Sequence, residues 1–270
     1  MRLQLGCTGP EARARPGARA DAEGQAELGG EQPAGPATRI VIYGTGGVAR
    51  ETLQLVKDLA AAGARLVCTG FLVDTGFYQS ELVADLRVLG DADWLRTDEQ
   101  VAVAIAVGSP AARRRIAERI ERNFGARVVT LIHPRATIGD SVTIGTGGIA
   151  CAGCVATVDI SIGAYAQLHV SCTIGHDVTI GSFVTIAPGA NIGGWAEIGE
   201  GTLVGSGVVV LPRRRIGHWS VIGAGSVVTT DVPENTTVAC VPARVIAQRG
   251  PGWHLESDHE RIEQVYTGGL

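Results

Sequence analysis

Apolar residues recur at every sixth position over most of the second half of the chain. The pattern runs without insertion from Ile138 to Val228, and most of these apolar residues are followed by glycine. A strict period of six is typical of a parallel β-helix, in which each short strand forms one side of a coil. Helices, with a period of about 3.6, and alternating strands, with a period of about two, do not produce it. Because three steps close a triangular coil of 18 residues, residues 18 apart are expected to be stacked neighbours.

The segment before this repeat alternates between strand and helix patterns. Strands are predicted over residues 39–43, 65–72, 101–107 and 127–132. One helix is predicted from a glycine-rich segment to about residue 62, and a second over residues 111–123. Ser109-Pro110 supplies the second helix with an N-cap and a favoured first-turn proline. This alternation predicts a small Rossmann-like α/β domain.

The chain is therefore expected to have four parts. Residues 1–37 contain almost no large apolar side chains and are expected to form a disordered leader, because they cannot bury enough surface to offset their ordering entropy. Residues 38–134 form the α/β domain, which is expected to bind a nucleotide sugar, and residues 135–246 the β-helix. Residues 247–270 form a C-terminal tail.

Composition narrows the function classes. The 270 residues are 45% hydrophobic, enough for two cores, and the formal net charge is −4, which gives no sign of a nucleic-acid or membrane surface. We find no apolar run long enough to span a bilayer and no signal-peptide pattern, so a cytoplasmic location is expected.

Two cysteines in Cys151-Ala-Gly-Cys154 resemble half of a zinc or redox site. The second half of a zinc site is missing. The repeat instead places Cys154 and Cys172, which are 18 residues apart, one above the other inside the prism as reduced packing residues. No metal is expected.

Gly44-x-Gly46-Gly47-x-Ala49 fits a dinucleotide-binding loop, because it follows a predicted strand and opens a predicted helix. Glycines let the backbone approach a phosphate, and a helix N-terminus favours negative charge. Asp74, at the end of the second strand, is a candidate ligand for a ribose or base. The alternative is a tight turn that binds nothing.

His176 occupies the third position of its repeat, which should face outward, and is followed by Asp177. An exposed imidazole beside a carboxylate is suited to general base catalysis. The residue 18 positions further on is Gly194, whose backbone N–H can stabilise an oxyanion. This pair suits acyl transfer, and the alternative is a solvated histidine beside a turn glycine. His169, on the preceding edge, is placed to reach the same cleft.

These motifs together resemble the hexapeptide-repeat acyltransferases. The resemblance is closest to the family of nucleotide-sugar N-acetyltransferases and sialic acid O-acetyltransferases. It covers residues 38–246 and is carried by the glycine loop, residues 174–190, Gly193-Gly194, residues 222–228 and Val241-Pro242-Ala243-Arg244.

The resemblance implies a left-handed β-helix and a homotrimer with acetyl-CoA in the groove between neighbouring prisms. It implies that His176 is the base on the sugar amine, that Asp177 supports it and that Gly194 contacts the thioester carbonyl. The α/β domain would hold the nucleotide of the sugar. The implied substrate-binding residues are Gly44, Gly46, Gly47, Asp74, His169 and Thr185, and the implied cofactor-binding residues are Gly194, Ala224, Pro242, Ala243 and Arg244.

The chain departs from the family pattern at three places. His169 stands where Asn is frequent, Thr185 where a second histidine is frequent, and Cys240-Val241 where Gly-Asn is usual. The hypothesis from the sequence is an acetyl-CoA-dependent N-acetyltransferase that acts on a nucleotide-linked amino sugar. O-acetylation of a free sugar of the sialic acid type and a non-catalytic β-helix trimer stay open as alternatives.

Overall fold

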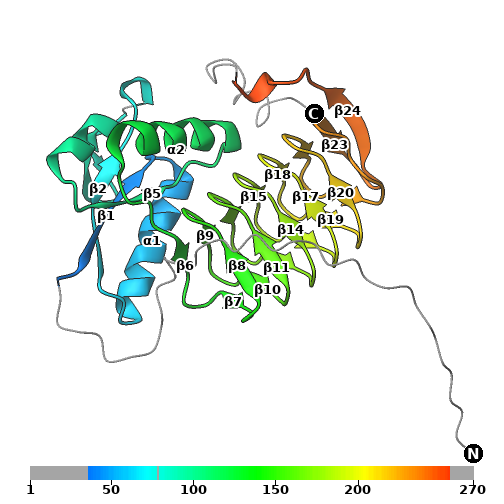
Figure 1. Cartoon of the computed structure of the whole chain (residues 1–270), viewed down its shortest axis with the longest axis horizontal. Helices are drawn as coiled ribbons and strands as arrows, with labels where there is room; N and C mark the ends of the chain where they lie inside the picture. The colour runs from blue at the N-terminus through cyan, green and yellow to red at the C-terminus, as the bar shows by residue number, and fades with distance from the viewer. Residues whose placement is uncertain (1–35, 78, 256–270) are drawn as a thin grey trace, which may run out of the picture. The chain divides into compact units, whose positions relative to one another are not determined.

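The computed structural model describes residues 36–77 and 79–255. Within them, an α/β domain is followed by a β-helix of stacked parallel strands (Figure 1). The predicted leader lies outside the described residues except for its last two positions, and so does most of the predicted tail. No helix in the described ranges has both the length and the apolar character that crossing a bilayer requires.

The sheet of the α/β domain has five strands in the order β3-β4-β2-β1-β5. Its elements in chain order are β1 (Thr38–Tyr43), α1 (Gly47–Ala61), β2 (Leu66–Leu72), β3 (Leu82–Val83), β4 (Leu86–Gly90), the 3-10 helix η2 (Ala92–Thr97), β5 (Ala102–Ile105) and α2 (Pro110–Phe124). The helices cover opposite faces because alternate residues of β1 point to opposite sides. Ile40 and Ile42 pack in one cluster with α1, whereas Val41 and Tyr43 pack in another with α2.

The sequence prediction for this domain was right in its main elements and wrong in two. The β3–β4 hairpin was missed, because it consists of short segments between polar residues. The strand predicted over residues 127–132 is divided: Val128 makes a single bridge to Val103 of β5, and β6 (Leu131–Ile132) pairs with a strand of the β-helix. This segment passes from one sheet to the other, so it cannot pair along its whole length with either.

The β-helix has three parallel sheets, and every strand pairs with the strand one coil away. The β7 sheet contains β7 (Thr137–Ile138), β10 (Val155–Ala156), β13 (Thr173–Ile174), β16 (Asn191–Ile192), β19 (Val209–Val210) and β22 (Val227–Val228). The β8 sheet contains β8 (Val142–Ile144), β11 (Ile160–Ile162), β14 (Thr179–Ile180), β17 (Glu197–Ile198) and β20 (Arg215–Ile216). The β9 sheet contains β6, β9 (Ile149–Ala150), β12 (Gln167–Leu168), β15 (Thr185–Ile186), β18 (Leu203–Val204), β21 (Val221–Ile222), β23 (Thr236–Ala239) and the antiparallel β24 (Arg244–Gln248).

The predicted register of 18 is confirmed by the strand pairing. Ala156, Ile174, Ile192 and Val210 are successive partners in the β7 sheet. The apolar first positions are buried in all coils after the first, where Ile138 and Ile144 are partly buried against the same core. Filling the prism with these side chains gives it a continuous apolar core, which is the main source of its stability.

The turns of the β-helix share one backbone conformation. The fourth position of fourteen successive repeats has a positive φ, whether or not the residue is glycine. These positions are Gly147, Gly153, Asp159, Tyr165, Ser171, Asp177, Phe183, Gly189, Trp195, Gly201, Gly207, Arg213, Trp219 and Gly225. A positive φ is uncommon for residues other than glycine. The coil therefore imposes this conformation on bulky and charged side chains, and it sets their direction at each corner.

Candidate active site

The turn after β13 and the turn after β16 lie one coil apart and form the centre of the candidate site. The first carries His176 and Asp177, and the second carries Gly194 and Trp195. The N–H of Trp195 donates to the carbonyl oxygen of His176 at 2.9 Å, so the two turns stack directly. The stacking predicted by counting 18 residues is confirmed.

The close approach of His176 explains why a glycine is needed one coil further on. A Cβ atom at Gly194 would lie 2.8 Å from Nε2 of His176 and 2.9 Å from its Cε1. Any side chain at this position would occupy the place of the imidazole ring. In the described part of the chain, the Gly194 N–H donates to no backbone carbonyl. It is therefore available to a bound ligand.

Asp177 and Trp195 contact the imidazole from two sides. Nδ1 of His176 lies 2.9 Å from Oδ2 of Asp177, and both side chains are nearly half exposed. The indole ring of Trp195 meets the imidazole edge to face, with 4.2 Å between ring centroids. The carboxylate favours the tautomer with the proton on Nδ1, which leaves Nε2 as a proton acceptor. The arrangement is that of a general base with a carboxylate behind it.

The glycine loop has two parts with different reasons for glycine. Gly44 has φ +120°, donates to Leu72 O at 2.8 Å, and a Cβ there would lie 2.7 Å from the carbonyl oxygen of Ala106. Close packing against the segment after β5 therefore accounts for this glycine. Gly46 and Gly47 form the N-cap and first residue of α1, and added Cβ atoms there would meet open space. A phosphate can approach this helix N-terminus without steric hindrance.

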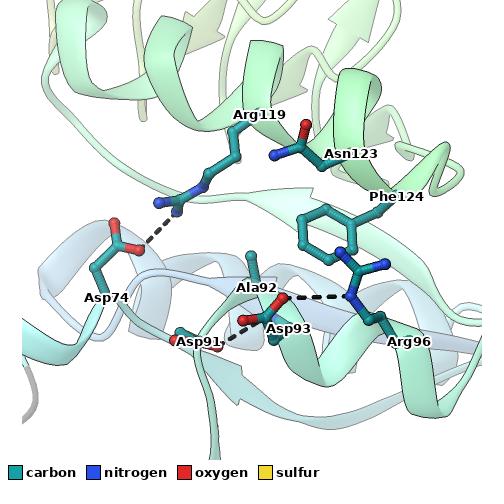
Figure 2. Close-up of a pocket in the computed structure, with 8 residues that line it drawn as sticks. All are labelled: Asp74, Asp91, Ala92, Asp93, Arg96, Arg119, Asn123 and Phe124. Atoms are coloured by element: carbon teal, nitrogen blue, oxygen red, sulfur yellow. Dashed lines mark hydrogen bonds and ion pairs between the residues drawn. The ribbon is translucent and has the colours of Figure 1, made fainter.

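A pocket of about 210 Å³ opens beside this loop, at the carboxyl edge of the sheet. Its lining comes from the ends of β2 and β4, from η2 and from α2, and consists of Asp74, Asp91, Ala92, Asp93, Arg96, Arg119, Asn123 and Phe124. Figure 2 shows the Arg119 side chain reaching from α2 towards Asp74, and Arg96 lying beneath the Phe124 ring. This edge is where doubly wound α/β domains bind ligands.

Asp74, a predicted ligand for ribose or base, already has partners inside the protein. One oxygen, Oδ1, accepts from Tyr43 Oη and from Arg119 Nη2, each at 2.6 Å. Burial and the adjacent carboxylate raise the pKa of Tyr43, so the phenol stays protonated as the donor. Asp74 is thus held in a fixed orientation at the wall of the pocket.

His169 and Thr185, the two departures from the family pattern, lie at the junction between the α/β domain and the β-helix. His169 is 8% exposed, and its Nδ1 lies 3.8 Å from Glu51 of α1. Burial, with a contribution from nearby Arg113, lowers the pKa of His169 to about 4, so the ring is neutral at pH 7. Thr185 accepts from Arg113 at 2.9 Å and donates to Gly108 O at 3.2 Å. Both side chains have structural contacts, and neither contacts His176 among the printed hydrogen bonds of the described chain.

Arg113 holds this junction together and was not singled out in the sequence. Its guanidinium is fully buried and donates to backbone carbonyls of both domains, among them Val107 O and Phe183 O at 2.7 Å and Tyr165 O at 2.8 Å. Burial lowers its pKa to about 9, so it remains charged at neutral pH. The helical spacing from Arg113 to Ile116 and Ile120 places all three on the buried face of α2, and this was the available signal.

The predicted cofactor residues divide between two corners of the prism. Gly194 follows a strand of the β7 sheet, whereas Ala224 follows β21 of the β9 sheet. Ala243 is buried and donates to Val227 O at 2.8 Å, and Arg244 is exposed at the start of β24. One copy of the chain therefore presents these residues on both edges of the β7 sheet.

Cys154 and Cys172 stack as predicted. Both are fully buried, and their sulfur atoms lie 3.6 Å apart. The described side chains include no group of three or more His, Cys, Asp or Glu arranged to hold a metal ion.

Comparison with known proteins agrees with this geometry. Residues 39–120 match the family model of the PglD N-terminal domain, and residues 196–230 match that of the bacterial transferase hexapeptide (six repeats). The chain is 30% identical over 163 residues to GDP-perosamine N-acetyltransferase from Escherichia coli O157:H7, a match that spans 59% of this chain and 72% of that enzyme. The chain belongs to the hexapeptide-repeat family of nucleotide-sugar N-acetyltransferases.

Solved structures of this acetyltransferase family match both domains. The acetyltransferase domain of PglB from Neisseria gonorrhoeae FA1090, in complex with acetyl coenzyme A, is 28% identical with a TM-score of 0.70, over 78% of this chain and 100% of that one. PerB from Caulobacter crescentus, in complex with CoA and GDP-perosamine, is 27% identical with a TM-score of 0.69, over 80% and 99% of the two chains. The fold and the acetyl-CoA-dependent reaction class predicted from the sequence are thereby confirmed.

Proposed function

We propose that this member of the family transfers the acetyl group of acetyl-CoA to an amino group of a nucleotide-linked sugar, with His176 as general base. The observation that carries the proposal is the stacking of the His176 imidazole on Gly194, with Asp177 bound to Nδ1. This places a proton acceptor and a free backbone N–H on one exposed corner, about one strand spacing (~4.8 Å) apart.

In the proposed reaction, Nε2 of His176 accepts a proton from the amine as its nitrogen attacks the thioester carbonyl. The Gly194 N–H donates to the oxyanion of the tetrahedral intermediate, a type of contact that contributes about 10²–10³ in rate. When the intermediate collapses, the carbon–sulfur bond breaks and the imidazolium returns its proton to the departing thiolate. Asp177 stabilises the imidazolium while it carries the charge. No covalent intermediate with the protein is required.

A homotrimer accounts for the division of the predicted cofactor residues. Gly194 and Ala224 lie on opposite edges of the β7 sheet, so a single copy does not bring them to one groove. In a trimer of parallel prisms, one edge of one copy faces the other edge of its neighbour. Acetyl-CoA would then lie between the Gly194 edge of one copy and the Ala224 edge of the next.

The acceptor is proposed to bind through its nucleotide to the α/β domain. Gly46 and Gly47 would present the N-terminus of α1 to the phosphates, and the pocket at Asp74 would take the base or ribose. Within one copy, Arg113 and Thr185 fix this domain to the β9 sheet, whereas His176 follows the β7 sheet. A neighbouring copy in the trimer is therefore the proposed source of the acceptor for each His176.

The test is the variant His176→Ala, with acetyl-CoA, a panel of nucleotide-linked amino sugars that includes GDP-perosamine, and free thiol as the readout. We expect the variant to fold and to bind CoA but to lose nearly all turnover. The matched control is His218→Ala, since His218 is also a third-position histidine but lies on a different corner, where it accepts from Glu200 N–H. Near-normal turnover by His176→Ala would refute the assignment.

A further inference from the structure

The corner that carries His176 continues into a row of three stacked side chains. Trp195 follows one coil after His176, and Arg213 follows one coil after Trp195. The Arg213 N–H donates to Gly194 O at 2.9 Å, so the third turn stacks on the second as the second does on the first. The Arg213 guanidinium lies over the Trp195 ring, 4.2 Å from its centroid, while the imidazole contacts the same ring.

Arg213 differs from the two arginines that follow it. Arg214 lies 3.6 Å from a carboxylate oxygen of Asp231, and Arg215 lies 3.2 Å from one of Glu197. In residues 36–77 and 79–255, Arg213 has no acidic partner. It is exposed in a chain whose formal net charge is −4, and contact with an aromatic face leaves its N–H donors available.

A guanidinium with free donors fits a phosphate group, which it binds with two parallel hydrogen bonds. Both substrates of the proposed reaction carry phosphates, so their distance from the reacting atoms decides between them. In CoA, the whole pantetheine arm separates the sulfur from the nearest phosphate. In a nucleotide-linked amino sugar, a single pyranose ring separates the amine from the diphosphate at the anomeric carbon. Arg213 lies only one coil beyond Gly194, which matches the shorter separation.

We infer that Arg213, held in place by Trp195, binds the diphosphate of the sugar nucleotide and thereby makes the site selective for nucleotide-linked over free amino sugars. The Trp195 ring is a positioning residue that contacts the imidazole and the guanidinium together. The inference rests on the proposed function and extends it, because it assigns the acceptor's phosphates to residues outside the glycine loop. It also gives a physical reason why free sugars would be poor acceptors.

The first test compares Arg213→Gln with the matched control Arg215→Gln, whose arginine already pairs with Glu197. For Arg213→Gln we expect KM for GDP-perosamine to rise about tenfold, which corresponds to about 1.4 kcal/mol, with KM for acetyl-CoA unchanged. The control should resemble the wild type. Trp195→Ala should raise the same KM, and Trp195→Phe should restore most of the affinity because an aromatic face remains. An increase confined to KM for acetyl-CoA, or no change in either KM, would overturn the inference.

The second test measures binding without turnover, by calorimetry with GDP, UDP and CoA. Arg213→Gln should weaken binding of whichever nucleoside diphosphate the wild type binds and leave CoA binding unchanged. Weaker binding of CoA alone would assign Arg213 to the CoA phosphates and overturn the inference. If the wild-type protein binds a nucleoside diphosphate through Arg213 but acetylates no sugar nucleotide, the proposed function fails while the diphosphate site stands.

Discussion

Replacing Arg113 with methionine is expected to destabilise the protein strongly, although methionine is apolar and of similar length. The guanidinium donates to five backbone carbonyls and to the Thr185 hydroxyl, and no carboxylate is among its partners. Methionine would fill much of the space but would leave these acceptors without donors. The carbonyls of Val107, Tyr165 and Phe183, which accept the three shortest bonds, would suffer most.

The expected magnitude follows from these three carbonyls. A buried polar group left without a partner costs about 1–3 kcal/mol, and removing one partner of a buried charged contact costs about 3–5 kcal/mol in all. We therefore expect Arg113→Met to lower the free energy of unfolding by about 3–5 kcal/mol. In a chain of this size that corresponds to a fall in Tm of roughly 10 °C.

The assay is thermal and urea unfolding of Arg113→Met beside two controls. Arg122→Met removes an exposed guanidinium that pairs with Glu118 in the same helix, and it should cost less than about 1 kcal/mol. Thr185→Val removes one acceptor of the network and should cost about 1 kcal/mol. If Arg113→Met unfolds at the wild-type temperature, the buried hydrogen bonds do not hold the junction and the reasoning is wrong.

Three further predictions concern other parts of the molecule. The pKa of His169 is about 4 in the folded protein and about 6.5 when unfolded, so the unfolded state binds more protons between these values; stability should fall as pH drops from 6.5 to 4, and His169→Asn should remove this part of the pH dependence measured by urea unfolding. Gly194→Ala should displace the His176 ring and lower kcat more than tenfold with the fold retained by circular dichroism, whereas Gly250→Ala, where an added Cβ meets nothing within 4 Å, should leave kcat unchanged. Ser109→Ala should lower the free energy of unfolding by about 1 kcal/mol, because the hydroxyl that caps α2 is lost; an unchanged urea midpoint would contradict this.

The β-helix was predictable because its period fixes its geometry. Once residues 18 apart are stacked, the pairing of Cys154 with Cys172 and of His176 with Gly194 follows from counting alone. The same counting leads from Asp177 to Trp195 and Arg213, but it does not reveal that their side chains contact one another. Such contacts depend on rotamers and on the left-handed backbone conformation at these positions, which the sequence pattern does not encode.

The junction between the domains was not predictable in the same way. Arg113 lies in a run of three arginines, which suggests an exposed helix face, and His169 looks like an outward-facing residue of the repeat. Both are buried because the α/β domain packs against the β9 sheet, and no local pattern specifies that packing. The β3–β4 hairpin was missed for a related reason, since strands this short are stabilised by pairing with β2 rather than by their own propensity.

The uninterrupted register makes the length of the prism a quantity that changes only in whole steps. Deleting one residue within a coil would turn the following inward side chains outward until the next corner, since successive side chains of a strand face opposite sides. Deleting a full coil between Gly194 and Val228 would keep every remaining side chain facing as before and shorten the prism by about 4.8 Å. The span available to an extended co-substrate above the acetyl-transfer centre is thus graduated like a ruler, and chains of this architecture can adapt to longer or shorter ligands by gaining or losing entire turns.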